Sequence, residues 1–473
     1  MRLNGWCPQS TAKRLSWTLL LCGLLSLSVY TAASRAAIAL TVLSNDPYTN
    51  TTSFHQAEVE PASFASGSTV VTAFQAGRFP DGGSSNIGFA TSANGGSTWK
   101  NGFLPGTTVY AKPAGPYQAV SDEAVAFDAK HGVWQIIMDG LDSDSVGVAV
   151  LVSRSIDGGN TWNSPVTVSA GTNDQDRDKT WIVCDNNAGS PYYGNCYAEW
   201  DDMGHNQQLH MAVSKDGGAT WTQSKVPTAP AVIGGQPLVQ PSGKVIMPIQ
   251  QASKIVSFAS TNGGTSYTGP TTIATLSYHT VAGNFRGAPN VTAAMDSTGK
   301  VYAAWQDCRF IANCTANDIV YSSSADGTTW SAVTRIPIDS ITSGVDHFLP
   351  GLAVDPSTSG ATTKLAVTYL YYPVSNCTES TCQLDVGFVR SSNAGSTWTA
   401  KTQEAGPMTM SRLPETSQGY MIGDFISTAF VTTSAGDSPM SFFESALAVT
   451  GKTCTLGDIK SCQERTVEHA FAP

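Results

Sequence analysis

The chain of 473 residues carries 36 acidic and 26 basic side chains, a net charge of −10, and only 13% of its residues are charged. A net negative charge disfavours nucleic acid or an anionic membrane as the main partner, because both repel it. The 44 glycines and the few charged side chains favour many short strands and turns over long surface helices.

The first 39 residues have the pattern of a secretory signal peptide. A membrane anchor is the alternative, but the apolar stretch is short and interrupted by serines, which favours the signal peptide. We therefore expect a secreted, extracellular protein with residues 40–473 as one mature domain, anchored at its N-terminus only if the segment stays uncleaved. The pattern consists of basic Arg2, Lys13 and Arg14, apolar Leu15 to Tyr30, and a cleavage site at Ala37-Ile38-Ala39.

Eight of the ten cysteines follow this segment and fall into close pairs. An even number at short separations is typical of disulfides in exported proteins, whereas a zinc site needs C-x-x-C or Cys/His spacings, and none occurs. We expect four local disulfides: Cys184–Cys196, Cys308–Cys314, Cys377–Cys382 and Cys454–Cys462.

One short turn is repeated six times along the rest of the chain. Five copies follow a strand of alternating apolar residues, and the closing aromatics of all six lie 46 to 68 residues apart. Alternation that runs into Asp/Asn-Gly-Gly is typical of a strand followed by a hairpin, and the spacing suits a unit of four strands. The copies are SANGGSTW (92–99), SIDGGNTW (155–162), SKDGGATW (214–221), STNGGTSY (260–267), SADGTTW (324–330) and SSNAGSTW (391–398).

A second landmark, the start of an inner strand, recurs once in each unit. Together with the turns it predicts an all-β fold: a β-propeller of four-stranded antiparallel blades, with seven blades favoured over six and the repeated turn between the third and fourth strands. The last unit has no such turn, and Leu40 to Ser44 is predicted to supply its outer strand. The strand starts are Glu60, Asp122, Asp178, Gly235, Ala288, His347 and Ile422.

The turn Ser-x-Asp-x-Gly-x-Thr-Trp resembles the Asp-box, or bacterial neuraminidase (BNR) repeat, of the sialidase superfamily. Asn replaces Asp in three copies, and the fifth copy is one residue short. The resemblance covers essentially the whole mature chain and implies a sialidase-like propeller whose turns lie on the outer face, away from the active site. We expect a structural turn, because its carboxylate can accept backbone N–H groups, whereas calcium requires more oxygen ligands than one carboxylate supplies.

Polar residues near the strand ends are the first candidates for chemistry, because the inner strands of a propeller converge on its central channel. At the starts of the inner strands these are Glu60, Asp122, Asp178, Lys179, Gln236, Arg286, Asp346, His347 and Asp424. A second group follows the next strand and consists of Arg78, Asp81, Glu199, Asp201, Asp307, Arg309, Tyr371 and Tyr372.

The resemblance to sialidases implies particular roles for some of these residues. Sialidases bind the substrate carboxylate with three arginines, use an Asp as acid/base and a Tyr–Glu pair as nucleophile, and AFQAGRF followed by DGG looks like their first-blade pattern. The implied catalytic residues are Asp81, Tyr420 and Glu199, with Glu444 as the alternative to Glu199. The implied substrate-binding residues are Arg78, Arg286, Arg309, Asp307 and His347.

One departure from the sialidase pattern concerns the opening of the first blade. EVEPAS stands where sialidases have an arginine, so that Glu60 would repel a substrate carboxylate. Two functions therefore stay open: an exo-α-sialidase-like glycoside hydrolase acting on extracellular glycans, or a non-catalytic propeller that binds glycan or protein. We expect an extracellular glycan or glycoconjugate as partner, a monomer, no cofactor or metal, and no stable membrane association after cleavage.

Overall fold

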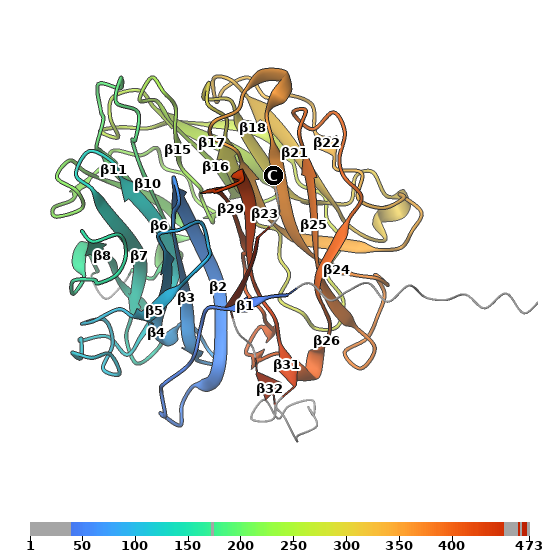
Figure 1. Cartoon of the computed structure of the whole chain (residues 1–473), viewed down its shortest axis with the longest axis horizontal. Helices are drawn as coiled ribbons and strands as arrows, with labels where there is room; N and C mark the ends of the chain where they lie inside the picture. The colour runs from blue at the N-terminus through green and yellow to red at the C-terminus, as the bar shows by residue number, and fades with distance from the viewer. Residues whose placement is uncertain (1–38, 172–174, 449–461, 464–465, 471–473) are drawn as a thin grey trace, which may run out of the picture. The chain divides into compact units, whose positions relative to one another are not determined.

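The computed structural model describes residues 39–171, 175–448, 462–463 and 466–470. Its regular structure is almost entirely antiparallel β, as the sequence predicts (Figure 1). None of the helices in this part of the chain has the length and hydropathy of a membrane span. The predicted signal peptide up to residue 38, and Cys454 with its predicted disulfide, lie outside the described residues.

Most strands form antiparallel sets of four that follow one another along the chain, and a pairing of Ser84 with Val120 joins the first two sets into one eight-stranded sheet. The first two sets are β2 (Phe54–Ser66), β3 (Thr69–Arg78), β4 (Ser84–Ser92), β5 (Lys100–Phe103) and β6 (Ala119–Asp128), β7 (Val133–Leu141), β8 (Gly147–Ser155), β9 (Val166–Ala170). The next two are β10 (Arg177–Cys184), β11 (Cys196–Asp202), β12 (Gln208–Ser214), β13 (Thr222–Gln223) and β14 (Val232–Ile233), β15 (Leu238–Val239), β16 (Val245–Gln251), β17 (Lys254–Ser260), β18 (Thr268–Thr275), where β14 and β15 share one edge.

The second half of the chain continues the pattern. Its sets are β19 (Thr292–Met295), β20 (Val301–Asp307), β21 (Asp318–Ser324), β22 (Thr334–Arg335); β23 (Asp346–Val354), β24 (Leu365–Tyr372), β25 (Gln383–Ser391), β26 (Thr402–Thr409); and β29 (Ser427–Thr433), β30 (Gly436–Glu444), β33 (Thr466–Ala470) with β1 (Thr41–Val42). Two short pairs are β27 (Glu415–Thr416) with β28 (Gly419–Tyr420) and β31 (Leu447–Ala448) with β32 (Cys462–Gln463). Single-turn 3-10 helices lie at Met203–His205, Ala312–Cys314, Gly360–Thr362 and Met410–Arg412.

The two ends of the described chain meet in one sheet. β1 pairs with β33, Thr41 opposite Glu468 and Val42 opposite Val467, and β33 pairs with β30. The prediction that Leu40 to Ser44 supplies the outer strand of the last set is thereby confirmed. Strand β1 is the outer, fourth strand of this set. In the earlier sets the fourth strand follows the repeated turn.

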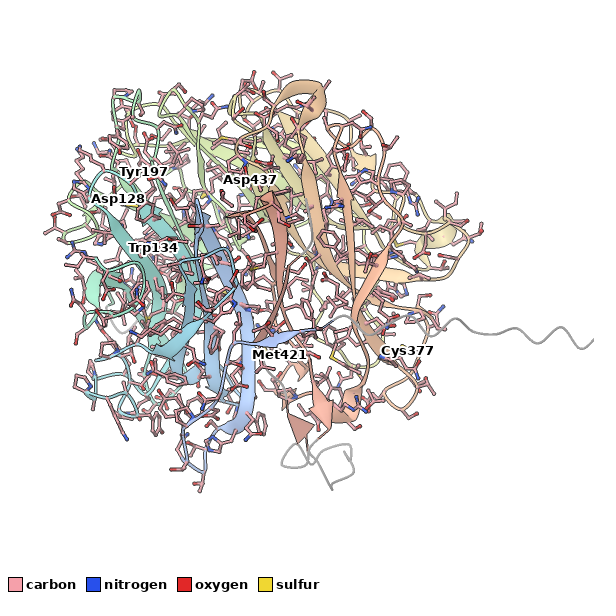
Figure 2. All side chains as sticks on the ribbon, in the orientation of Figure 1. Asp128, Trp134, Tyr197, Cys377, Met421 and Asp437 are labelled. Carbon is pink, nitrogen blue, oxygen red and sulfur yellow. A yellow bond between two sulfur atoms is a disulfide. The ribbon has the colours of Figure 1, made fainter. Side chains whose placement is uncertain are left out.

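The first strands of consecutive sets lie against one another. Strand β2 contacts β6 and β29, β6 contacts β10, β10 contacts β15, β15 contacts β19, β19 contacts β23, and β23 contacts β29. Apolar side chains fill the space between neighbouring sheets; Trp134 and Tyr197, labelled in Figure 2, belong to two such layers. Residues that begin these first strands, although far apart in sequence, are therefore brought together.

The repeated turn has the hydrogen bonds that its sequence predicts. Asp157 Oδ1 accepts the backbone N–H groups of Asn160 (3.0 Å) and Thr161 (2.9 Å), and its Oδ2 accepts the Thr161 hydroxyl (2.6 Å). The Ser155 hydroxyl accepts the Gly159 N–H at 3.0 Å, and the Trp162 indole donates to the Gly159 carbonyl at 3.1 Å. The turn thus satisfies its own backbone groups and fixes the closing ring.

The closing aromatic of a turn packs against the preceding set of strands. The ring centroids of Trp162 and Phe89 on β4 are 5.7 Å apart, and Trp398 lies 6.4 Å from Tyr321 on β21. Trp99, in the first turn, lies 6.2 Å from Phe442 of the last set. Each of these turns therefore fastens its own sheet to the neighbouring one.

Three of the four predicted disulfides are confirmed. They are Cys184–Cys196, Cys308–Cys314 and Cys377–Cys382, with Cα–Cα distances of 4.0, 4.9 and 4.9 Å.

Candidate functional site

The same β-bulge recurs near the start of four first strands. On β2, β6, β10 and β23, two residues face one residue of the next strand. Positive φ is uncommon for residues with a Cβ, and bulges re-aim side chains, often beside functional sites. The first residue of each bulge has positive φ: Glu60 (60°), Asp122 (52°), Lys179 (57°) and Leu349 (46°).

Lys179 is the centre of a buried ion cluster. Its Nζ lies 2.7 Å from Asp122 Oδ1, 2.8 Å from Asp424 Oδ2 and 4.0 Å from Asp178 Oδ1. Its side chain is 7% exposed, while that of Asp178 is 30% exposed. The cluster therefore joins β6, β10 and the segment before β29, and Asp178 is its member most open to solvent.

Two of the predicted arginines extend this cluster. Arg286 NH2 lies 2.5 Å from Asp424 Oδ2, and Arg78 NH1 donates to the Gly83 carbonyl at 2.7 Å. Both guanidinium groups also approach the sulfur of Met421, labelled in Figure 2, at 3.4 Å for Arg78 Nε and 3.9 Å for Arg286 NH1. Arg78 and Arg286 are thus close together, each already held by a partner.

Two glutamates complete the cluster on the β2 side. The Glu60 carboxylate accepts the Asp424 N–H at 2.9 Å and the Gln75 side-chain amide, and its own N–H donates to Glu444 Oε1 at 2.5 Å. Burial raises the pKa of Glu60 and raises that of Glu444 well above its ordinary value.

The remaining predicted binding residues have other partners. Arg309 forms a two-pronged pair with Asp307 (2.8 and 2.6 Å) and also donates to the Thr275 carbonyl. His347 is 1% exposed, and its Nε2 lies 3.1 Å from Asp339. The hydrogen bond to His347, together with Lys401, lowers the pKa of Asp339 to about 2. These residues form networks of their own on β20 and β23.

The predicted catalytic residues lie in three different environments. Asp81 is exposed in the loop between β3 and β4. Tyr420 is 2% exposed in an apolar cluster with Phe285 and Met410, and burial raises its pKa. Glu199 is fully buried on β11, and burial raises its pKa well above the ordinary value.

The pKa values of the carboxyl groups in the cluster are shifted in opposite directions. Burial works against ionisation of Asp122 and Asp424, but the Lys179 ammonium outweighs it and holds the pKa of each below its ordinary value. Burial raises the pKa of the adjacent Asp178 to about 7, with the Asp122 charge adding to the shift and Lys179 opposing it. The two carboxylates raise the pKa of Lys179 well above its usual value despite burial.

Two further acids lie behind this cluster. Asp139 on β7 and Asp201 on β11 are 1% and 0% exposed, and within the described residues no hydrogen-bond donor reaches the oxygens of either. Burial raises the pKa of both well above the ordinary value. A buried carboxyl group without a donor is destabilised in its charged form, so this environment favours the protonated form of both groups.

Carboxylate oxygens of Asp122, Asp139 and Asp178 lie within 4.8 Å of one another, a grouping that could hold a cation. The positive charge at this place is already supplied by Lys179, whose Nζ contacts Asp122 and faces Asp178. An ammonium this close would repel a divalent ion. We therefore describe the cluster as lysine-centred.

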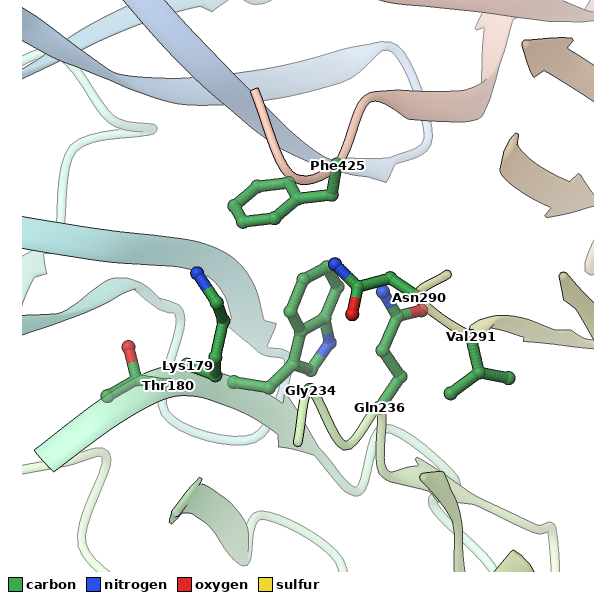
Figure 3. Close-up of a pocket in the computed structure, with 8 residues that line it drawn as sticks. Lys179, Thr180, Gly234, Gln236, Asn290, Val291 and Phe425 are labelled. Carbon is green, nitrogen blue, oxygen red and sulfur yellow. The ribbon is translucent and has the colours of Figure 1, made fainter. Parts of the chain in front are cut away.

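A small pocket opens beside Lys179 (Figure 3). Its volume of about 20 Å³ has room for about one water molecule. The rings of Trp181 and Phe425 stand edge to face, with centroids 5.9 Å apart. The lining residues are Lys179, Thr180, Trp181, Gly234, Gln236, Asn290, Val291 and Phe425.

Several residues around the site were not among the sequence candidates. Trp181 lies two residues after Lys179 in the run DKTW, and Phe425 directly follows Asp424 in the run GDF, but an aromatic beside a strand start equally predicts core packing. Asp139 lies in VWQIIMDG, and the apolar residues of this run predict a strand. The run does not indicate that Asp139 lies close to Asp122 and Asp178. Only the pairing of separate strands reveals these contacts.

No protein-family model and no curated protein sequence matches the chain. Among solved structures it is similar to a protein of unknown function from Dyadobacter fermentans (15% identity, 76% of this chain and 99% of that chain, TM-score 0.47). It is also similar to the Hadza microbial sialidase Hz136 (16%, 67% and 64%, TM-score 0.48) and to the NanB sialidase of Streptococcus pneumoniae (13%, 92% and 71%, TM-score 0.45).

Proposed function

We propose that the mature chain is a secreted, seven-bladed, sialidase-like β-propeller. The successive four-stranded sets, the contacts between their first strands, and the pairing of β1 with β33 support this architecture. The recurrent turn supports it independently, because a motif that recurs at the same place in six of the seven units is typical of radially repeated sheets. The bulges on the first strands then form the functional face around Lys179.

We further propose that this face is a glycoside hydrolase centre acting on extracellular glycans. The observation that carries the proposal is the pair Asp178 and Asp122, whose oxygens lie within 4.8 Å and whose pKa values are shifted in opposite directions. This separation is too short for the inverting mechanism, whose carboxyl groups lie about 6.5–9.5 Å apart, and so favours the retaining mechanism, in which one carboxyl group is protonated and the other ionised.

In the proposed reaction, Asp178 donates its proton to the glycosidic oxygen while the bond to the anomeric carbon breaks. The Asp122 carboxylate attacks that carbon, and water later displaces it with Asp178 acting as base, so that configuration is retained. Lys179 keeps Asp122 ionised for this role. The Trp181 and Phe425 rings offer an apolar face for a sugar, but the pocket between them must widen to admit one.

The charge balance of the site favours a neutral sugar over a sialoside. Arg286 is bound to Asp424, and Arg78 is buried beside Glu60, so that neither guanidinium is available for a substrate carboxylate without breaking an existing contact. We therefore expect hydrolysis of neutral glycosides to exceed that of sialosides.

The test is hydrolysis of fluorogenic α- and β-glycosides, including a sialoside, by the purified protein. Asp178→Asn should lower kcat/KM on the best substrate by about 10²–10⁴-fold, the usual contribution of general acid catalysis. The matched control, Asp144→Asn in the exposed turn after β7, should retain full activity. NMR of the first product should show retained configuration. Binding of glycans without hydrolysis of any of them would instead support the non-catalytic alternative.

A further inference from the structure

Two side-chain amides at the pocket beside Lys179 each have one group without a partner. Gln236 Oε1 accepts the Ala293 N–H at 2.8 Å, and Asn290 Nδ2 donates to the backbone carbonyl of Asp424 at 2.9 Å. These bonds to the backbone determine which way each amide points. No atom in the described part of the chain forms a hydrogen bond with Gln236 Nε2 or Asn290 Oδ1. The pocket therefore presents one free donor group and one free acceptor (Figure 3).

The burial of Gln236 makes its free donor group informative. Gln236 is 9% exposed, and its backbone N–H already donates to the Pro248 carbonyl at 3.0 Å. A buried donor without an acceptor is destabilising unless water or a ligand pairs with it. The open space beside this side chain is the pocket, so the acceptor for Gln236 Nε2 has to enter from there.

Gly234 keeps the acceptor side of the pocket open. Its φ is 66°, in the left-handed region that favours glycine, and a Cβ at this position would lie 3.2 Å from Asn290 Oδ1. A side chain there would crowd this oxygen. Because Gly234 has none, Asn290 Oδ1 stays within reach of a group bound in the pocket.

The size and the polarity of the pocket define what it can bind. A volume of about 20 Å³ admits about one water molecule, so a sugar ring does not fit but a single hydroxyl group does. A hydroxyl group both accepts and donates, and it therefore pairs with an amide N–H and an amide oxygen at once. A carboxylate only accepts and would leave Asn290 Oδ1 without a donor, whereas an ammonium group only donates and would leave Gln236 Nε2 without an acceptor.

We propose that this pocket binds a single hydroxyl group of the sugar, with Gln236 Nε2 donating to its oxygen and its O–H donating to Asn290 Oδ1. This role rests on the proposed glycoside hydrolase function, since Lys179 lines the pocket and lies 4.0 Å from Asp178. The sugar ring stays outside, and its hydroxyl group takes the place of a water molecule. Gln236 and Asn290 thereby select glycosides that carry an unsubstituted hydroxyl group at one particular ring position.

Binding of methyl glycosides to the Asp178→Asn protein tests the proposal separately from hydrolysis. The probes are the methyl α- and β-glycosides of glucose, galactose and mannose, titrated by saturation-transfer NMR. At least one should bind, and one of its monodeoxy analogues should bind about 10-fold more weakly, because the buried amide of Gln236 is then left unpaired. Equal binding of the parent glycoside and all its monodeoxy analogues, or binding of none of the probes, would overturn the proposal.

A double-mutant cycle assigns this hydroxyl requirement to Gln236. Gln236→Glu keeps an acceptor for the Ala293 N–H but replaces the donating amide group by an oxygen, so the parent glycoside and the deoxy analogue should bind it with similar affinity. The control Gln223→Ala changes an exposed glutamine on the outer strand β13 and should keep the full difference. A difference that persists in Gln236→Glu would refute the role of this residue.

Hydrolysis by the unmodified protein separates a failure of this pocket from a failure of the hydrolase. Binding that depends on Gln236, without hydrolysis of any glycoside, would support the pocket and reject the hydrolase. Hydrolysis with the same hydroxyl requirement in the Gln236→Glu protein would support the hydrolase and reject the pocket.

Discussion

Replacing Lys179 with methionine tests whether the ion cluster is the electrostatic centre of the site. The substitution keeps the length of the side chain but removes the ammonium that lies 2.7 Å from Asp122 and 2.8 Å from Asp424. Removing one partner of a buried ion pair typically costs about 3–5 kcal/mol, because the other charge stays buried without compensation. Asp424 keeps Arg286, so most of the cost falls on Asp122.

The pH dependence of this loss is a sharper test than its size. In the native protein the pKa of Asp122 is lowered, so its contribution to stability is present above its unfolded pKa and is lost as the pH falls through the folded value. Without Lys179, burial raises the pKa of Asp122 instead. Its contribution to the free energy of unfolding is then lost as the pH rises. The destabilisation by Lys179→Met should therefore be larger at pH 7 than at pH 5.

The assay is urea unfolding of both proteins at pH 5 and pH 7, with Lys364→Met as the control. Lys364 is 40% exposed and pairs at 3.1 Å with Asp355, which is buried but also accepts two hydrogen bonds from Ser357, so its removal should cost less than that of Lys179. If Lys179→Met costs no more than this control, or the same at both pH values, then the cluster does not depend on Lys179 as argued.

Three further predictions follow from the site and the turns. If Asp178 is the acid, then kcat/KM should fall as the pH rises through about 7, and a profile flat from pH 5 to 9 would contradict that role. Because the pKa of Asp201 is raised in the folded state, its contribution to stability is complete below the unfolded value of about 3.9 and declines as the pH rises. Asp201→Asn should therefore reduce the decline of the urea midpoint between pH 4.5 and 7.5, and an unchanged slope would refute this. In the turn, Asp157→Ala should cost about 1–2 kcal/mol by analogy with helix caps. Asp157→Asn should cost much less, because Asn94 makes the equivalent bonds to Thr98 (2.9 and 2.8 Å), and equal losses in urea unfolding would contradict the hydrogen-bond argument.

The sequence predicts the strands and turns well because the information is local and repeated. Asp157 and Thr161 are four residues apart and make their hydrogen bonds within one turn. The close cysteine pairs are equally local, and three of them form the predicted disulfides. Because the turn occurs six times, its pattern can be recognised even though Asn replaces Asp in three copies.

The site is less predictable because its contacts join residues that are far apart in sequence. Lys179 and Asp424 are 245 residues apart, yet their charged atoms are 2.8 Å from each other. The pattern of strand starts predicts Glu60, Asp122, Lys179 and Asp424 as members of one group of candidates. The position of a residue in the sequence does not indicate which other candidate its side chain contacts. Arg309 and His347, which bind Asp307 and Asp339, are therefore predicted together with the residues around Lys179.

The bulges explain how one architecture can present different side chains in four of its units. At the first bulge position, the same backbone conformation presents a carboxyl group in Glu60 and in Asp122, an ammonium group in Lys179 and an apolar side chain in Leu349. The turn at the other end of the strands varies little, because its hydrogen bonds require a particular set of side chains. A bulge requires only that its residue tolerate positive φ, so its side chain is free to change. Substitutions of Glu60, Asp122 and Lys179 should therefore change the activity of the proposed site, while substitutions in the turns should change only the stability of the fold.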